Sequence, residues 1–327
     1  MTADTALVTG AGGFIGSHLC EMLVAQGARV RALVHYNGRN DWGALEHVPS
    51  EARREIEIVM GDVRDPFAVR AAVKGCGTVY HLAALIAIPH SYRSPQSFFE
   101  TNVLGTLNVL EAARAENVGR VVHTSTSEVY GTAQRVPIEE THPLAAQSPY
   151  AASKIGADKA AESYHLSFGL PVVTVRPFNT FGPRQSARAI IPTIASQALA
   201  GRPVALGALT PTRDLLYVED TARGFIAAAQ SQRAVGQVVN LGTCSEISIS
   251  ALAAKVIAAC GATVPVVLDR ERLRPKNSEV ERLCASNARA RDLLGWRPAV
   301  SLDEGLRRVV DHVRAHLGRY KPEIYNT

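Results

Sequence analysis

Short apolar runs alternate with amphipathic stretches through the first half of the chain. Runs rich in Val, Ile, Leu and Thr predict buried strands at residues 6–9, 30–34, 56–59, 78–82, 120–124 and 172–175. The first stretch between them, Phe14 to Gln26, predicts a helix that stops at Gly27. Strands that alternate with helices indicate right-handed βαβ units. We therefore predict an α/β fold with a doubly wound parallel sheet, in which residues 172–175 form the last strand.

The pattern changes after Pro177. Proline and glycine recur, and helical stretches at 249–259 and 302–317 follow without the regular strand rhythm. We expect residues 1–176 to form a nucleotide-binding domain. Residues 177–327 are expected to form a smaller, mostly helical substrate lobe that is interleaved with it.

Composition narrows the class of protein. The 327 residues are 46% hydrophobic and 20% charged, which is typical of a globular protein with one large domain or two closely packed ones. No apolar run has the length of a membrane span, and we expect no signal peptide, so the chain is predicted to be cytoplasmic. The net charge of +5 comes without a dense basic cluster, so neither a nucleic-acid nor a membrane partner is expected.

The cysteines are odd in number and scattered. They are Cys20, Cys76, Cys244, Cys260 and Cys284. None of their spacings is typical of zinc ligands, so we expect reduced thiols and no metal site.

A glycine-rich run, Gly10 to Gly16, lies between the first predicted strand and helix. Gly10, Gly13 and Gly16 permit a tight turn and let the backbone approach a pyrophosphate, which the N–H groups at the helix start can bind. Such glycines also occur in purely structural turns, but their position between a strand and a helix favours a Rossmann-type dinucleotide site.

The end of the second strand leaves the choice of cofactor open. An acidic residue there would bind the adenosine ribose of NAD, but the strand ends at His35 without one. Arg39 could bind the 2′-phosphate of NADP or could be a solvated loop residue. Asp62, after the third strand, could accept a hydrogen bond from adenine or could belong to a turn.

Tyr150 and Lys154 form the candidate base for alcohol oxidation. Ser148 and Pro149 are typical of a helix start, so Tyr150 and Lys154 are predicted at i and i+4 on one helix face. A nearby ammonium and the positive ring of an oxidised nicotinamide would lower the pKa of the phenol. Tyr150 could then remove a hydroxyl proton while a hydride leaves the same carbon.

Thr126, Ser127 and Glu128 follow the carboxyl end of a predicted strand, where doubly wound sheets bind ligands. Thr126 could bind the reacting hydroxyl, Glu128 could act as a base and Ser127 could relay a proton. Alternatively, Thr and Ser cap the following turn. His123 is expected to be a packed strand residue.

These motifs resemble the extended short-chain dehydrogenase/reductase family, specifically its nucleotide-sugar epimerases and dehydratases. The resemblance covers nearly the whole chain and includes the glycine turn, the Tyr/Lys helix and the segments 81–84, 101–106, 176–184 and 294–298. Residues 184–192, 209–214 and 277–282 look closest to the UDP-N-acetylglucosamine 4,6-dehydratases.

The middle residue of the Thr-Ser-Glu run departs from one branch of this family. The nucleotide-glucose dehydratases typically carry Asp where this chain has Ser127. Ser at this place looks like the GDP-mannose dehydratases and the UDP-glucuronate decarboxylases. The proton donor to the leaving water is therefore left open between Glu128 and Ser127.

The resemblance implies roles for further residues. It implies a bound NAD, with NADP not excluded, lined by Gly10, Gly13, Phe14, Ile15, Gly16, His35, Arg39, Asp62, Val63, Leu82, Ala83, Ala84, Asn102, Tyr150, Lys154 and Pro177. It implies a nucleotide-sugar substrate, held by Asn179, Arg188, Ile190, Pro192, Arg213 and Arg282. It also implies a homodimer that pairs the helix at 97–115 with the Tyr150 helix.

The predicted activity is a 4,6-dehydratase, which oxidises C4 transiently, eliminates water across C5 and C6, and returns the hydride to C6. A 4-epimerase would use the same Tyr/Lys pair without needing Glu128. A UDP-glucuronate decarboxylase would lose CO₂ at the ketone stage. A non-catalytic NAD(P)-binding protein is the remote alternative.

Overall fold

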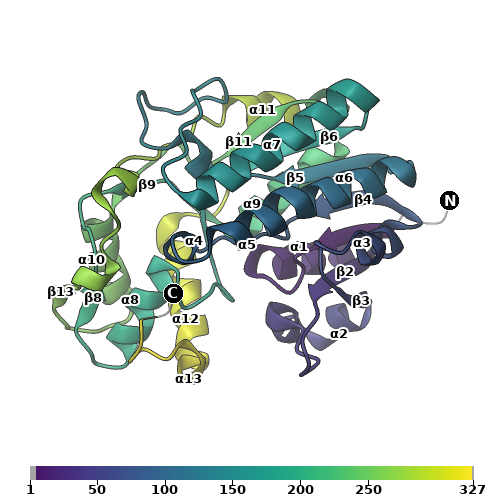
Figure 1. Cartoon of the computed structure of the whole chain (residues 1–327). Coiled ribbons are helices and arrows are strands. Elements are labelled where there is room, and N and C mark those ends of the chain that lie inside the picture. Colours follow the sequence, from purple (N-terminus) through teal and green to yellow (C-terminus); the bar gives the residue numbers. More distant parts are fainter. Residues whose placement is uncertain (1–4, 326–327) are drawn as a thin grey trace.

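A seven-stranded parallel sheet forms the centre of the computed structural model, which describes residues 5–325 (Figure 1). The strand order is β11-β6-β5-β4-β1-β2-β3. The strands are β1 (Thr5–Thr9), β2 (Arg29–His35), β3 (Ile56–Gly61), β4 (Cys76–His81), β5 (Arg120–Thr124), β6 (Val172–Pro177) and β11 (Val238–Leu241). The predicted fold class is confirmed. The first four residues, on which the expectation of no signal peptide depends, lie outside the described part.

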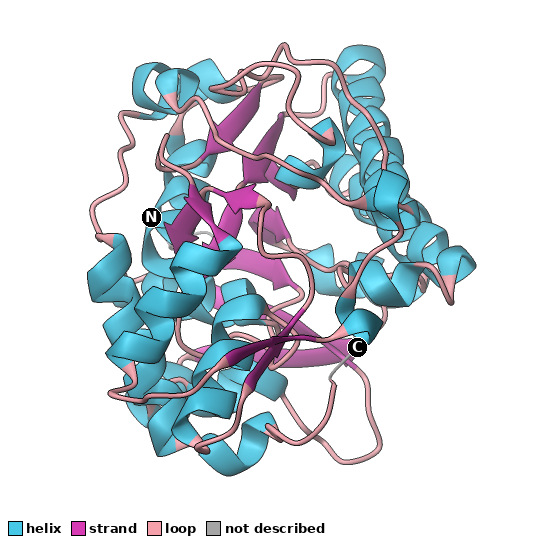
Figure 2. Cartoon of the chain, turned by 90° about the vertical axis from the view of Figure 1, so that its left-hand side faces the viewer, coloured by secondary structure: helices cyan, strands magenta, loops and turns pink. Residues whose placement is uncertain are grey.

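Helices cover both faces of this sheet, as Figure 2 shows. One face carries α1 (Phe14–Ala25), α9 (Val218–Gln230) and α11 (Ala288–Leu294), and the other carries α3 (Pro66–Val73), α6 (Gly105–Ala115) and α7 (Pro149–Phe168). Alternate strand residues supply the two cores: Ala6 and Val8 pack on the first face, and Leu7 packs on the second. Burial on both faces explains why the strands are nearly continuous apolar runs in the sequence.

The prediction that the sheet ends with residues 172–175 was wrong. Strand β11 pairs parallel to β6, with Val238 opposite Thr174 and Leu241 opposite Pro177. Its four residues are too few to show the alternating pattern that predicts a strand. The second half of the chain therefore adds a strand and two helices to the sheet.

A second hydrophobic core lies beside the sheet. It is built by α8 (Ile190–Leu199), α10 (Ile249–Ala259) and α12 (Leu302–Ala315), with the short α13 (Leu317–Tyr320). The predicted helix at 302–317 is thus divided at His316, whose φ of −129° leaves the helical region. Three two-stranded sheets complete this lobe: β7 (Asn179–Phe181) with β10 (Leu215–Tyr217), β8 (Val204–Leu206) with β13 (Val266–Leu268), and β9 (Thr212–Arg213) with β12 (Ile247–Ser248).

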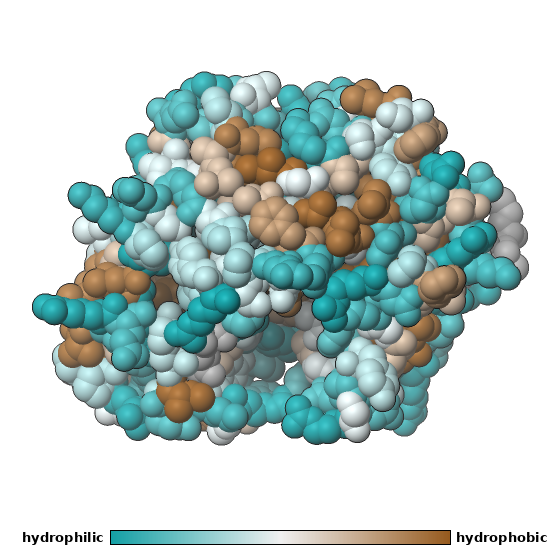
Figure 3. Space-filling view, viewed as in Figure 1, coloured by the Kyte–Doolittle hydropathy of each residue, from teal (hydrophilic) through white to brown (hydrophobic). Residues whose placement is uncertain are grey.

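The outer surfaces of α6 and α7 carry exposed apolar side chains. The largest are Leu104 and Leu107 near α6, Leu166 and Phe168 at the end of α7, and Phe99 in α5 (Pro95–Phe99). Figure 3 shows apolar side chains on this side of the molecule.

Short segments complete the description: α2 (Ser50–Arg54) follows β2, and α4 (Ile88–Ser91) follows β4. All five cysteines are free thiols. Within residues 5–325, no helix combines the length and the apolar character that a bilayer crossing requires. The same residues contain no group of three or more His, Cys, Asp or Glu side chains arranged to hold a metal ion.

Candidate active site

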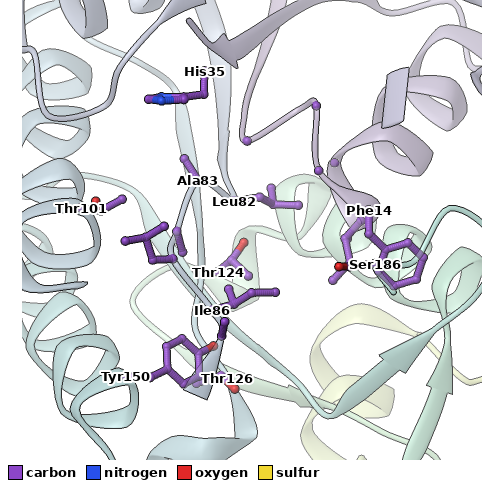
Figure 4. Close-up of a pocket in the computed structure, with 18 of the residues that line it drawn as sticks. Phe14, His35, Leu82, Ala83, Ile86, Thr101, Thr124, Thr126, Tyr150 and Ser186 are labelled. Atoms are coloured by element: carbon purple, nitrogen blue, oxygen red, sulfur yellow. The ribbon is translucent and has the colours of Figure 1, made fainter. Parts of the chain in front are cut away.

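A cavity of about 1100 Å³ lies between the carboxyl ends of the strands and the lobe. Its lining comes from the loops after β1, β2, β3, β4, β5 and β6 and from segments of the lobe. Figure 4 shows His35 at one end and Tyr150 with Thr126 at the other, with Phe14 and Ser186 to one side. The edge at which parallel strands end is where doubly wound sheets bind ligands.

The glycine turn forms one wall of this cavity. Gly10 has a φ of +69°, and a Cβ placed on it would lie 2.7 Å from the backbone nitrogen of Ala83. A Cβ on Gly16 would collide with the carbonyl oxygen of Gly10. Gly13 is the N-cap of α1 and offers no capping side chain, so the start of the helix can bind an anion.

Residues at the ends of β2 and β3 form the far end. The cavity is lined there by four residues that the sequence analysis assigned to the cofactor: His35, Arg39, Asp62 and Val63. Their contact with a cofactor stays a prediction. Asp62 accepts a hydrogen bond of 2.6 Å from Arg64, and this bond lowers the pKa of the carboxyl group. Asp62 therefore belongs to a turn and also lines the cavity, and its hydrogen bond with adenine stays a prediction.

Asn102 lies behind the lining of the cavity. It belongs to the π-helical turn η2 (Glu100–Leu104) and is fully buried. Its Oδ1 accepts from the backbone nitrogen of Leu85 at 2.8 Å, and its Nδ2 donates to Leu85 O and Ser153 Oγ, both at 2.9 Å. The side chain ties the loop after β4 to α7, so a direct contact with a cofactor remains a prediction.

Tyr150 and Lys154 lie on the first turns of α7, where the sequence placed them. Ser148 caps this helix by accepting from the backbone nitrogen of Ala151 at 3.1 Å. Both side chains are buried and line the cavity, and the Nζ of Lys154 donates to the carbonyl oxygen of Thr124 at 2.6 Å.

The pKa of the phenol differs from the expectation. Burial raises the pKa of Tyr150, and a hydrogen bond with Thr126 opposes this only in part. Burial also lowers the pKa of Lys154 to about 8. The expected lowering of the Tyr150 pKa by Lys154 is not found. The ammonium of Lys154 donates to Thr124, and a further positive charge is needed to favour the phenolate.

Thr126, Ser127 and Glu128 follow β5 and are all buried at the cavity. Thr126 caps the turn η3 (Ser127–Tyr130) by accepting from the backbone nitrogen of Glu128 at 3.2 Å. Its side chain thus both caps the turn and reaches Tyr150. The carboxylate of Glu128 raises the pKa of Tyr150, which shows that its charge acts at the phenol.

Three buried polar atoms of the lining have no hydrogen-bond partner among the described residues: Thr124 Oγ1, Asn179 Oδ1 and Gln185 Oε1. Unpaired buried polar atoms are unfavourable unless a ligand or water satisfies them. Together with the glycine turn, they indicate a cavity built for a polar ligand. Gln185 was missed in the sequence analysis as a site residue, although it lies in the segment 184–192 that carries the finer resemblance.

The residues predicted to hold the substrate are divided between two environments. Asn179 and Arg188 line the cavity. Ile190 and Pro192 belong to the first turn of α8, where Ile190 packs against the core of the lobe and Pro192 is buried, and neither lines the cavity.

The two remaining arginines are paired with acids. Buried Arg213 donates to Glu279 at 3.2 Å, whereas exposed Arg282 pairs with Glu246. Neither lines the cavity, although the charge of Glu128 acts on the pKa of Arg213. Arg274, which also pairs with Glu279, and Tyr325 line it instead; both come from irregular segments in which the sequence offers no periodic signal.

Comparisons with known proteins agree with this geometry. The family described as GDP-mannose 4,6 dehydratase matches residues 7–309. A dTDP-glucose 4,6-dehydratase from Streptomyces antibioticus is 33% identical over 97% of this chain and 94% of its own length. A UDP-glucose 4-epimerase from Mycolicibacterium smegmatis is 35% identical over 94% of this chain and 98% of its own length. Dehydratases and epimerases are therefore similar to this chain to the same degree.

A solved structure shows the same fold with a cofactor. The dTDP-glucose 4,6-dehydratase from Streptomyces venezuelae, determined with NAD bound, superposes with a TM-score of 0.86 at 32% identity. The match covers 97% of this chain and 99% of that one.

Proposed function

Because the chain belongs to the GDP-mannose 4,6-dehydratase family of nucleotide-sugar dehydratases and epimerases, we propose that it is an NAD-dependent nucleotide-sugar 4,6-dehydratase. We further propose UDP-N-acetylglucosamine as its substrate, on the resemblance of residues 184–192, 209–214 and 277–282. One observation supports dehydratase activity above the others: the Glu128 carboxylate is buried in the cavity next to Thr126 and Tyr150.

The cavity fits NAD. Gly10, Gly13 and Gly16 would leave room for a pyrophosphate against the start of α1, and His35 and Asp62, which line the far end of the cavity, would contact the adenosine. A nicotinamide held there would supply hydride transfer, from C4 of the sugar and back to C6 as C5 regains a proton. Arg39 lines the adenosine end, so NADP is the alternative cofactor.

Oxidation at C4 would be catalysed by Tyr150, with Thr126 and Lys154. Tyr150 removes the proton from the C4 hydroxyl group, and Thr126 holds that hydroxyl by a hydrogen bond. Because burial raises the pKa of the phenol, the positive ring of a bound nicotinamide would be needed, beside the Lys154 ammonium, to favour the phenolate.

Glu128 would carry the elimination. The ketone at C4 acidifies the C5 proton, and the Glu128 carboxylate removes it as the C6 hydroxyl group departs. The departing oxygen takes its proton from Glu128 or through Ser127, which lies beside it in η3. An epimerase needs no base for C5, so a buried Glu128 at this place favours the dehydratase over the 4-epimerase.

The test is incubation of the purified protein with UDP-N-acetylglucosamine, followed by mass spectrometry. We expect a product lighter by one water, formed without added cofactor because the net redox change is zero. A product of unchanged mass with a new sugar NMR spectrum would identify a 4-epimerase and overturn the dehydratase.

Two variants separate the half-reactions. Glu128→Gln is expected to reduce bound NAD⁺ transiently without forming the dehydrated product, as followed by absorbance of the reduced nicotinamide. Tyr150→Phe, the matched control, should block that first absorbance change. Normal turnover by Glu128→Gln would exclude Glu128 as the base.

We also propose that two copies pair through α6 and α7, whose outer surfaces carry Leu107 and Leu166. Size-exclusion chromatography with light scattering tests this dimer, and a monomer at micromolar concentration would contradict it.

A further inference from the structure

A buried network lies one helical turn beyond Lys154 on α7. Its centre is Asp158, whose side chain is 5% exposed. The carboxylate accepts from Ser125 Oγ at 2.8 Å and from His123 Nε2 at 3.1 Å. Ser125 lies between Thr124, which accepts from Lys154, and Thr126, so Asp158 is bonded to the segment that carries the proposed chemistry.

Arg176 completes the network from β6. Its Nε and NH2 groups donate to Asp158 Oδ2 at 3.2 and 2.8 Å. Its NH1 group donates to Tyr130 Oη at 2.9 Å, and Tyr130 in turn donates to Asn240 Oδ1 at 2.8 Å. A buried carboxylate with this many donors is held ionised and in one orientation.

Lys154 and Asp158 are four residues apart, so they share one face of α7. Burial disfavours the ammonium of Lys154, and the carboxylate of Asp158 is the opposing influence that raises its pKa. His81 and His123 also face Lys154, but burial lowers the pKa of both, so they are neutral near pH 7. Asp158 itself has a lowered pKa: burial alone would raise it, but the His123 hydrogen bond and the charge of Arg176 together prevail.

We infer that Asp158 is a positioning residue for the proposed reaction: its carboxylate keeps the buried Lys154 ammonium charged and, through Ser125, holds the end of β5 in place. Arg176 supports this role by holding the carboxylate against burial. The inference rests on the proposed function, because it is the oxidation step that requires the ammonium. Asp158 itself lies behind Lys154 and acts through it.

The direct test is the pKa of Lys154 by NMR, with lysine labelled at the ε-carbon. The chain has only six lysines, and Lys154→Arg identifies the signal of interest. Asp158→Asn keeps the shape but removes the charge, so we expect the pKa of Lys154 to fall by about one unit. An unchanged pKa in folded Asp158→Asn would overturn the inference.

Tyr130→Phe is the matched control. It breaks the hydrogen bonds of Tyr130 to Arg176 and Asn240 but leaves the Asp158 charge. We expect this variant to lose stability without moving the pKa of Lys154. An equal fall in both variants would show general loosening of the core and would also overturn the inference.

If Asp158→Asn does not fold, a second charge variant tests the same electrostatic effect on Lys154. Arg176→Gln removes the guanidinium that holds Asp158 ionised against burial, so the pKa of Lys154 should fall, as in Asp158→Asn. A rise or no change would contradict the proposed electrostatic role.

In activity assays, the same effect should appear as a shift of the alkaline limb of kcat/KM. Loss of the Asp158 charge makes Lys154 lose its proton at lower pH, so the limb of Asp158→Asn should move to lower pH by about one unit, while that of Tyr130→Phe should not move. The NMR titration needs no substrate. A shifted pKa in a protein that forms no dehydrated product would therefore refute the proposed function alone.

Discussion

The two halves of the cavity are built in different ways. The cofactor half comes from the ends of β1, β2, β3 and β4, each followed by a turn or helix, and its lining includes the backbone of the glycine turn. The substrate half is assembled from side chains far apart in the sequence, such as Asn179, Arg188, Arg274 and Tyr325. In this half Arg274 pairs with Glu279, which also pairs with Arg213, a buried residue outside the cavity lining.

This difference determines which substitutions each half of the cavity tolerates. A backbone site is intolerant of added atoms, because neighbouring peptide groups cannot move aside. A site of side chains is sensitive to lost charges and hydrogen bonds, and far more so where the group is buried than where it is exposed.

The largest effect is expected in the cofactor half, for Gly16→Ala. The new Cβ would collide with Gly10 O and approach Ala11 Cα to 2.9 Å, so we expect a loss of about 3 kcal/mol of unfolding free energy and weaker NAD binding. Urea unfolding and NAD titration measure both. Gly38→Ala is the control, because nothing lies within 4 Å of its Cβ position. Equal losses of unfolding free energy in the two variants would contradict the role given to close backbone packing at Gly16.

The next effect concerns His18, which joins the two halves. It lies on α1 and donates from Nε2 to Pro183 O at 2.9 Å, and burial and the charge of Arg184 lower its pKa to about 3. Below pH 6.5, His18 is protonated in the unfolded chain but stays neutral in the folded chain. Stability should therefore fall by about 2 kcal/mol between pH 7 and pH 5 through this residue.

Urea unfolding at both pH values tests this dependence. His18→Gln removes the titrating group, so its stability should depend less steeply on pH over the same range. The same slope in the parent and in His18→Gln would assign the acid sensitivity elsewhere.

The smallest effect is expected in the substrate half. Arg213 is buried and within the electrostatic influence of Glu128, so Arg213→Gln should raise the KM for the nucleotide sugar about tenfold. Arg282→Gln is the matched comparison: its partner Glu246 is engaged at the surface, and the KM should change less than about twofold. A larger effect of Arg282→Gln would show that the exposed arginine binds the substrate, as the resemblance implies.

The cofactor half was the more predictable one. Local rules place the glycine turn after a strand, Ser148 at the start of α7, and Tyr150 and Lys154 on one helix face, and the structure has each of them there. The rules depend on neighbours within a few residues, so the pattern is visible without the fold. Strand β11 and the lining residues Gln185, Arg274 and Tyr325 escaped prediction, because they reach their places through contacts with distant segments.

By itself the sequence determined the alternation of strands and helices, the glycine turn and the set of chemical groups at the end of β5, since each follows from spacing along the chain. The tertiary structure decided which of those groups share a cavity, which arginines are already paired, and how burial changes their pKa values. Dielectric environment and pairing depend on groups brought together from distant positions. For that reason the bonds of Asp158 with Ser125 and Arg176, which are distant from it in sequence, emerge only in the folded protein.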